Sequence, residues 1–229
     1  MRVRFVAALV LAAMMGGIVG QAAGPVSEGA ESSDQEVRLP PPQEKGPLAL
    51  EEALAARRSV RSFRGTALTP EQLGQLVWSA QGISDPARGF RTAPSAGALY
   101  PLEVYAVTAE GVFQYVPMHH AIRKVKGGDL RGELAAAALG QRCVVEAPMA
   151  IVITGVYGRT VRKYGERARR YVDLEAGCVA ENVFLQATAL GLGSVAVGGF
   201  EDRKVREVLG CAAEEEPILI IPVGEAAPS

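Results

Sequence analysis

The chain has 229 residues, of which 48% are hydrophobic and 21% are charged, and its formal net charge is -1. This length can bury one sizeable core, so we expect one domain of roughly 180 residues with appendages. Because there is no basic excess, a nucleic-acid partner is not expected.

The N-terminal segment has the pattern of a secretory signal peptide, which we predict over residues 1–23. Arg2 and Arg4 precede an apolar run, and the small residues around Ala22 suit a signal peptidase. We therefore expect export to the periplasm or another extracytoplasmic space. The alternative is an uncleaved membrane anchor over residues 5–20, although this run is short for a full span.

Residues 24–46 are rich in Ser, Glu, Gln, Gly and Pro and contain three consecutive prolines from Pro40. This composition is typical of a solvated chain that is partly in the polyproline conformation. We therefore predict a flexible linker that carries no chemistry. The folded domain is then expected over residues 47–229.

The remainder predicts an α+β domain in which helices alternate with short strands. Thr69, Pro70 and Gln72 are a helix start signal, with a capping residue, a proline at the first helical position and a capping box. The predicted helices cover residues 47–57, 69–82, 130–139, 166–190 and 202–209. The predicted strands cover residues 102–108, 112–116, 149–156, 195–197 and 218–223.

The helix predicted over residues 166–190 is the expected centre of the domain. Its second half is apolar on nearly all sides, which predicts burial all round and, in a domain of this size, a subunit interface. Cys178 lies in this helix and is expected to be a small buried hydrophobe. Since Cys143 and Cys211 have no metal-ligand spacing with it or with a histidine, no metal site is predicted.

Arg57, Arg58 and Arg61 lie close together at the end of a predicted helix, with Ser59 between them. Guanidinium groups bind phosphate oxygens bidentately, so the cluster suits a phosphorylated ligand. A solvated basic face is the alternative. Further along the chain, the small residues between two prolines at 94–101 would let a flat ligand approach the backbone closely.

Two later segments also permit chemistry. Gly198 and Gly199 end a predicted strand and leave backbone amides unshielded by side chains; a plain turn is the alternative. Lys163 and Tyr164 could act as a general acid or base, or could lie at a solvated helix start. The dinucleotide-like sequence at residues 191–196 follows a helix and precedes a strand, which is the reverse of the order that a dinucleotide site requires.

Together, these motifs resemble the SagB-type branch of the nitroreductase family, which includes azoline dehydrogenases. The resemblance extends over residues 48–226 and rests on several segments that keep their order. They are residues 57–63, 78–83, 93–105, 163–165, 170–177, 191–194 and 198–200. The resemblance implies an α+β homodimer with a central mixed or antiparallel sheet flanked by helices, and one FMN per subunit at the dimer interface.

The same resemblance implies roles for individual residues. The FMN phosphate and ribityl chain would be held by Arg57, Arg58, Ser59 and Arg61. The isoalloxazine ring would be lined, from the other subunit, by Pro94, Ser95, Ala96 and Gly97. The flavin N5 would lie near Gly198 and Gly199. The pair implicated in proton transfer during azoline oxidation is matched by Lys163 and Tyr164.

Several positions depart from the family pattern, and two of them concern FMN binding. Ala98 stands where classical nitroreductases have an Asn, so contacts to the flavin edge are expected from Gln81 and from the backbone. Glu225 follows the last strand, where the family usually has a basic residue near the phosphate.

These expectations combine into an exported FMN-dependent oxidoreductase. A reduced nicotinamide donor and then an electron-poor acceptor would use the same flavin in a ping-pong sequence. One alternative is a dehydrogenase of azolines or related heterocycles with FMN as hydride acceptor, and another is a flavin-binding module without catalysis. Small molecules and a second copy of the chain are the expected partners.

Overall fold

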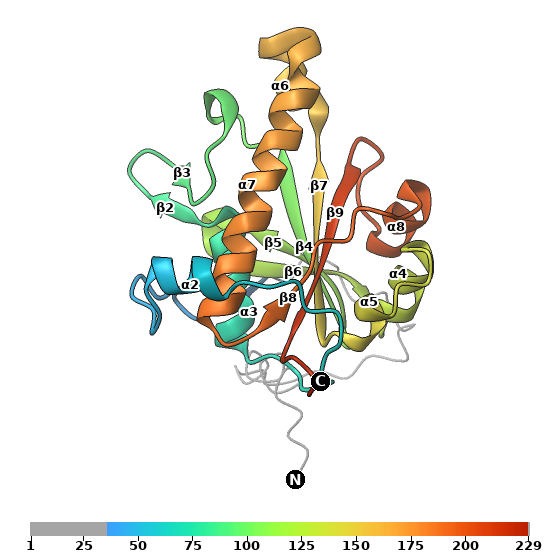
Figure 1. Ribbon diagram of the computed structural model, residues 1–229. Helices are drawn as coiled ribbons and strands as arrows, with labels where there is room; N and C mark the ends of the chain where they lie inside the picture. Colours follow the sequence, from blue (N-terminus) through green and yellow to red (C-terminus); the bar gives the residue numbers. More distant parts are fainter. Residues whose placement is uncertain (1–35, 229) are drawn as a thin grey trace, which may run out of the picture.

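A seven-stranded antiparallel sheet forms the centre of the computed structural model, which describes residues 36–228 (Figure 1). In spatial order the strands are β1 (Glu36–Arg38), β6 (Ala121–Gly127), β5 (Gly111–Val116), β4 (Leu102–Thr108), β7 (Met149–Gly155), β9 (Glu216–Gly224) and β8 (Gly193–Ser194). Every neighbouring pair is antiparallel. A separate ribbon pairs β2 (Ile83–Asp85) with β3 (Phe90–Arg91).

Side chains alternate between the two faces of the sheet, and each face covers its own core. In β4, Val104 and Ala106 belong to one cluster of buried residues, whereas Tyr105 and Val107 belong to the other. Because successive residues in a strand point to opposite faces, this pattern requires cover on both sides. The predicted α+β class is confirmed, with the helices outside the sheet.

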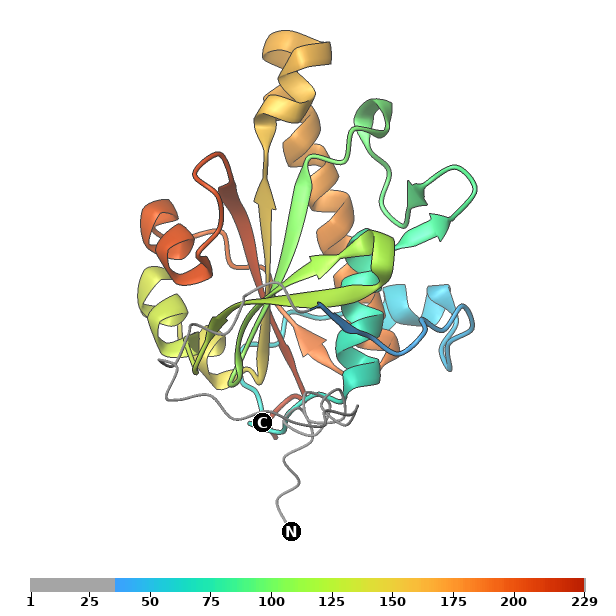
Figure 2. The same cartoon turned by 180° about the vertical axis from the view of Figure 1, so that it is seen from behind.

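Helices cover both faces (Figures 1 and 2). The first core is covered by α3 (Pro70–Gln81) and α7 (Ala168–Ala189), and α2 (Leu50–Ala56) contacts α7. The second core is covered by α4 (Arg131–Ala137), α5 (Arg142–Glu146) and α8 (Asp202–Leu209). The helix α6 (Tyr157–Tyr164) extends beyond the sheet toward α7. Short 3-10 turns are η2 (Ala96–Ala98), η3 (Pro117–His119) and η4 (Gly165–Arg167).

Local signals predicted several elements well. The helices expected over residues 202–209 and 166–190 are α8 and α7. The predicted capping box is present, because the Thr69 hydroxyl accepts from the Gln72 N–H (3.2 Å) and the Gln72 side chain accepts from the Thr69 N–H (2.9 Å). These two bonds satisfy donors that the helix itself leaves unpaired at the start of α3.

The linker predicted over residues 24–46 differs from the structure at its C-terminal end. Glu36–Arg38 form β1 at the sheet edge, and the Gln75 side chain bonds both the N–H (2.8 Å) and the carbonyl (3.0 Å) of Gln43. The prediction of a flexible linker is therefore wrong from residue 36 onward, because strand pairing at the sheet edge satisfies the backbone hydrogen bonds of this segment. The predicted signal or anchor segment lies outside the described residues. Among residues 36–228, no helix is long and apolar enough to span a membrane.

Two predictions of burial also differ from the structure. Cys178 is exposed, because it lies on the side of α7 that faces away from the sheet. In the second half of α7, Val183 is buried by the chain's own core, whereas Phe184 and Leu185 are only half-buried. The helix is therefore covered on one side within this chain, and not all round.

Candidate functional site

The arginine segment (residues 57–61) leaves the end of α2 and runs beside the edge strand β8. Ser59 forms an isolated bridge with Ser194, and the Val60 N–H donates to the Ser194 carbonyl (3.0 Å). Gly193 permits this approach, since a Cβ there would lie 2.6 Å from the Val60 Cβ. The backbone of the segment is thus fixed, while most of its polar side chains remain exposed.

The charges of this segment have few partners. Among the described residues, Arg57 and Arg61 form no ion pair and no side-chain hydrogen bond. Arg58 Nη1 donates to two backbone carbonyls at the C-terminal end of α2 (2.9 and 2.7 Å). Glu225 pairs with Arg64 (4.0 Å), so its charge is partly balanced. An anion with several oxygens fits this set of donors.

An extended segment connects β8 to a pair of exposed glycines. Ser194 and Val197 both pair with β9, so the backbone runs along the sheet edge. At about 3.3 Å per residue, the path from Ser194 to Gly198 spans roughly 13 Å. The amide N–H groups of Gly198 and Gly199 donate to no acceptor among residues 36–228, and the Gly199 carbonyl accepts from the Gln141 side chain (3.0 Å). These amides are therefore available to a ligand.

The Pro94 loop (residues 94–100) has an unusual backbone. The Ser95 hydroxyl accepts a hydrogen bond from the Tyr100 N–H (2.9 Å), which closes the loop. Gly97, Ala98 and Tyr100 all have positive φ, at 65°, 53° and 47°. Since positive φ is strained for residues other than glycine, the surroundings must hold this conformation in place.

Lys163 and Tyr164 of α6 meet the Pro94 loop. A Cβ at Gly97 would lie 2.7 Å from Lys163 Nζ and 2.8 Å from the Tyr164 hydroxyl oxygen, so both polar tips lie against this bare glycine. The Tyr164 ring packs edge-on against Tyr171 of α7, with 5.0 Å between centroids. One chain therefore brings the predicted proton-transfer pair and the predicted ring-lining loop together.

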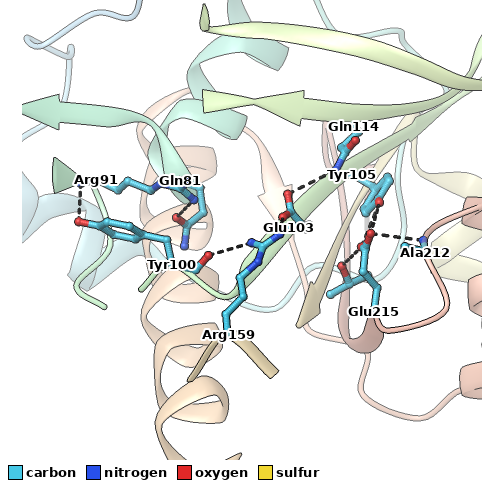
Figure 3. Close-up of polar contacts among 10 residues, drawn as sticks. Gln81, Arg91, Tyr100, Glu103, Tyr105, Gln114, Arg159, Ala212 and Glu215 are labelled. Atoms are coloured by element: carbon cyan, nitrogen blue, oxygen red, sulfur yellow. Dashed lines mark hydrogen bonds and ion pairs between the residues drawn. The ribbon is translucent and has the colours of Figure 1, made fainter. Parts of the chain in front are cut away.

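Polar contacts fix α6 to this loop (Figure 3). Arg159 donates to the Tyr100 carbonyl (3.1 Å) and forms an ion pair with Glu103 of β4 (2.6 Å). Glu103 also accepts from the Gln114 side chain in β5 (3.3 Å). Because Lys163 lies four residues after Arg159, the two residues share one side of α6. The same clamp that anchors the helix therefore sets the position of Lys163.

Gln81 takes a different position from the predicted one at a flavin edge. It is 1% exposed, its Nε2 lies 3.4 Å from Glu175 Oε1, and its Oε1 accepts from Arg91 Nη1 (2.9 Å). Because the Gln81 side chain is buried and each end of its amide is bonded within the chain, a direct flavin contact is not supported. Burial raises the pKa of Glu175 and lowers that of Arg91. This cluster was not predicted from the sequence. The signal that could have revealed it is Glu175, a carboxylate on the otherwise apolar buried side of α7.

The predicted site is divided between the two ends of α7 (Figure 1). The arginine segment lies beside β8, which follows the C-terminal end of the helix. The Pro94 loop lies with Tyr164 near its N-terminal part. Glu175, which Ser95 approaches, lies 14 residues before the end of α7, about 21 Å along the helix. A single chain therefore presents the arginine segment and the Pro94 loop as two half-sites along α7.

Comparisons with known proteins point in one direction. A sequence model of the Nitroreductase family matches residues 54–225. A protein of Methanocaldococcus jannaschii named for the nitroreductases is 44% identical over 195 residues, covering 82% of this chain and 96% of the relative. A crystal structure from Ralstonia eutropha, also named for the nitroreductases, has a TM-score of 0.77 and 29% identity, covering 93% of this chain and 97% of that chain.

Two more distant similarities concern particular chemistries. The microcin B17-processing protein of Escherichia coli is 25% identical over 153 residues, covering 62% of this chain and 56% of that protein. The NADPH:FMN oxidoreductase of Vibrio harveyi, solved with NAD+, has a TM-score of 0.59 and 22% identity, covering 78% of this chain and 69% of that chain. The second similarity shows the fold alone. Because the first is distant, the SagB-type branch has weaker support than the family.

Proposed function

This chain belongs to the nitroreductase family and is an oxidoreductase, and we propose that it is FMN-dependent. A reduced nicotinamide donor and an electron-poor acceptor would use one site in turn, in a ping-pong sequence. One observation carries the proposal: Arg57, Arg61 and the amides of Gly198 and Gly199, all without a partner within residues 36–228, lie along one sheet edge. A phosphate and a ring nitrogen are acceptors that suit these two sets of donors.

FMN, when bound, would accept and return a hydride at its ring N5. The chain's own residues would bind and orient it. Arg57, Arg61 and the Ser59 hydroxyl would hold the phosphate end, with the free nitrogens of Arg58 beside them. Gly198 and Gly199 would donate to the ring edge, and their lack of side chains would let the ring approach the backbone.

We also propose that a second copy of the chain completes the site. The two half-sites lie apart along α7, so an antiparallel pair of subunits would set the Pro94 loop of one against the arginine segment of the other. Leu50 and Leu54 of α2 are 59% and 53% exposed, and they provide apolar surface on the same side of the sheet as α7. Apolar surface of this kind is covered in many assemblies.

A second candidate function is supported by the contacts of Lys163 and Tyr164. Their polar tips meet at Gly97, where they could take or deliver a proton as a substrate is oxidised. This arrangement, together with the distant similarity to the microcin B17-processing protein, favours an azoline or related heterocycle as substrate. In this case FMN would be the hydride acceptor. A flavin-binding module without catalysis is only partly weakened as an alternative, because the exposed Arg64 (4.0 Å) balances part of the charge of Glu225.

Export is a further part of the proposal, and it rests on the predicted signal segment at residues 1–23. The mature chain should begin near Ala23 or Gly24 and be found outside the cytoplasm. N-terminal sequencing after cell fractionation tests this expectation. A chain that begins at Met1 in the soluble cytoplasmic fraction would contradict it, and a full-length chain in the membrane fraction would favour the anchor.

The experiment that best tests the function is the visible absorbance spectrum of the purified mature chain. We expect a yellow protein whose flavin band bleaches when NADH or NADPH is added and returns with an electron-poor acceptor. A yellow protein that bleaches only with an azoline-containing compound would select the second candidate. A colourless protein that does not take up added FMN would contradict both.

A further inference from the structure

Glu175 is a buried carboxylate that no step of the proposed reaction uses. It is 4% exposed and lies in α7 near the buried Val172, Ala176 and Val179. A carboxylate in apolar surroundings is unfavourable unless hydrogen bonds compensate for the lost water. Burial accordingly raises the pKa of Glu175, and hydrogen bonds from Ser95 and Gln81 act in the opposite direction. The question is what these bonds hold in place.

The hydrogen bonds join three elements at this carboxylate. Gln81, at the end of α3, places its Nε2 3.4 Å from Glu175 Oε1 and accepts from Arg91 through its Oε1 (2.9 Å). The Arg91 guanidinium lies over the Tyr100 ring, 4.5 Å from the centroid. On the other side, the Ser95 side chain lies close enough to Glu175 to lower the pKa of this carboxyl group. The Pro94 loop therefore meets Glu175 at Ser95, and it is linked to the same carboxylate at Tyr100 through Gln81 and Arg91.

The Ser95 hydroxyl has only one proton. Its oxygen accepts from the Tyr100 N–H (2.9 Å), so a bond in which Ser95 donates to Glu175 uses that proton fully. The positive φ angles of Ala98 and Tyr100 show that the loop is strained and must be held by its surroundings.

We propose that Glu175 is a positioning residue, whose carboxylate holds Ser95 and so keeps the Pro94 loop in its strained conformation. Through the loop, it sets where Gly97 meets Lys163 and Tyr164. The inference rests on the proposed FMN-dependent function, since the loop is expected to line the flavin. The proposal also changes the role expected for Ser95: its side chain would bind Glu175, and the backbone of the neighbouring residues would line the flavin.

The chain offers a matched control for this proposal. Glu215 is also a buried carboxylate, at 6% exposed, and it accepts from the Tyr105 hydroxyl (3.1 and 3.0 Å) and from the Thr154 hydroxyl (2.6 Å). It precedes β9 and does not contact the Pro94 loop. Glu175→Gln and Glu215→Gln therefore make the same chemical change in two buried clusters, of which only one holds the loop.

The first measurement uses the full mature chain without FMN. Hydrogen–deuterium exchange at residues 94–101 should be about tenfold faster in Glu175→Gln than in the wild type, because the loop opens more often. Exchange there should be unchanged in Glu215→Gln. The second measurement is FMN affinity by fluorescence quenching, which should fall about tenfold in Glu175→Gln only. Glu175→Asp keeps the charge and should restore part of both properties.

Ser95→Ala separates positioning from a general loss of stability. It removes the hydroxyl that Glu175 holds, so it should reproduce the faster exchange, and the double variant with Glu175→Gln should be no worse than either single change. If Glu175→Gln does not fold, loop exchange in Ser95→Ala alone tests the positioning role of Glu175. Unchanged loop exchange in Ser95→Ala, or equal acceleration in Glu215→Gln, would overturn the proposal. A wild type that does not bind FMN would contradict the proposed function, while the exchange data would still decide the role of Glu175.

Discussion

Arg57 and Arg61 carry positive charge beside β8 without an acidic partner among the described residues. If they bind the FMN phosphate, Arg57→Ala or Arg61→Ala should each weaken FMN binding by about 1.5–3 kcal/mol, the contribution of a charged hydrogen bond. Fluorescence titration of the FMN-free chain measures this change. Arg203→Ala is the control, since Arg203 is 78% exposed in α8 and pairs only with Glu207.

Equal affinity in all three variants would show that the arginine segment is a solvated basic surface. The size of the effect also distinguishes the two arginines. Because Arg61 lies near enough to Cys143 to affect its titration, it is positioned toward α5, whereas Arg57 lies at the end of α2. A larger loss for one variant would therefore place the phosphate nearer to that arginine, and equal losses would place it between the two.

Gly97 lies where the Pro94 loop meets the polar ends of Lys163 and Tyr164 in α6. In Gly97→Ala the new Cβ would lie 2.7 Å from Lys163 Nζ and 2.8 Å from the Tyr164 hydroxyl, so both tips must move. Gly89→Ala is the matched control, because its φ of 67° is almost the same as the 65° of Gly97 but nothing lies within 4 Å of the new Cβ. Both changes should cost about 1–2 kcal/mol of stability.

Only Gly97→Ala is expected to change catalysis, since it displaces groups that could move a proton. Thermal unfolding and steady-state turnover of both variants test this difference. Equal stability loss with equal turnover would mean that Lys163 and Tyr164 are not part of the reaction. Turnover that falls in Gly97→Ala alone would support their role, whichever substrate is used.

Gln81 and Glu175 show where prediction at the level of single residues ends. The sequence indicated the loop at residues 94–97, which is expected to line the flavin ring, and the pair Lys163 and Tyr164. It did not indicate that Gln81 would be used inside the protein, because its partner Glu175 is 94 positions away and meets it only when α3 packs on α7. Polar pairing across a core depends on tertiary packing, which local patterns do not contain.

At the level of elements, α3 shows a local signal that the structure confirms. The hydroxyl of Thr69 caps the helix, so Thr69→Ala should lower stability by about 1 kcal/mol, whereas Thr69→Ser keeps the bond and should be close to the wild type. For a domain of this size, that loss corresponds to a fall in melting temperature of about 2–4 °C. Differential scanning calorimetry of both variants checks it. An equal fall in both would show that the methyl group matters and the cap does not.

Other elements were not predictable from local signals. β6 carries Arg123, Lys124 and Lys126 within seven residues, and it is a strand because β5 and β1 pair with it on both sides. β1 itself lies in a segment whose composition is typical of a linker. In both cases the partner strand supplies the backbone hydrogen bonds, and that partner is distant in the sequence.

At the level of the whole molecule, the long helix α7 separates the two half-sites. The sequence predicted the helix and its apolar second half, and the resemblance implied a site shared between subunits. The structure refines this expectation, because Val183 is buried in the chain's own core. A charge at Val183 would therefore unfold the subunit, and the exposed leucines of α2 are a better place to test dimerisation.

Leu54 is 53% exposed on a helix that contacts α7, and Leu50 lies one turn before it at 59%. If a second subunit covers them, Leu54→Glu should convert a dimer into a monomer without changing the fold of the chain. Met118→Glu is the control, because Met118 is 72% exposed in the turn between β5 and β6. Light scattering gives the mass, and circular dichroism shows whether each variant is folded.

The same variant links assembly to cofactor binding. If the arginine segment of one subunit and the Pro94 loop of the other hold one FMN, the ligand prefers the dimer and stabilises it by mass action. Leu54→Glu should then weaken FMN binding, and added FMN should shift the variant back toward the dimer. Because the new carboxylate lies one turn before Arg57 and Arg58, the shift toward the dimer, and not weaker binding alone, shows the linkage. A folded, monomeric Leu54→Glu that binds FMN as tightly as the wild type would place the whole site within one chain. The separation of the half-sites along α7 argues against that result.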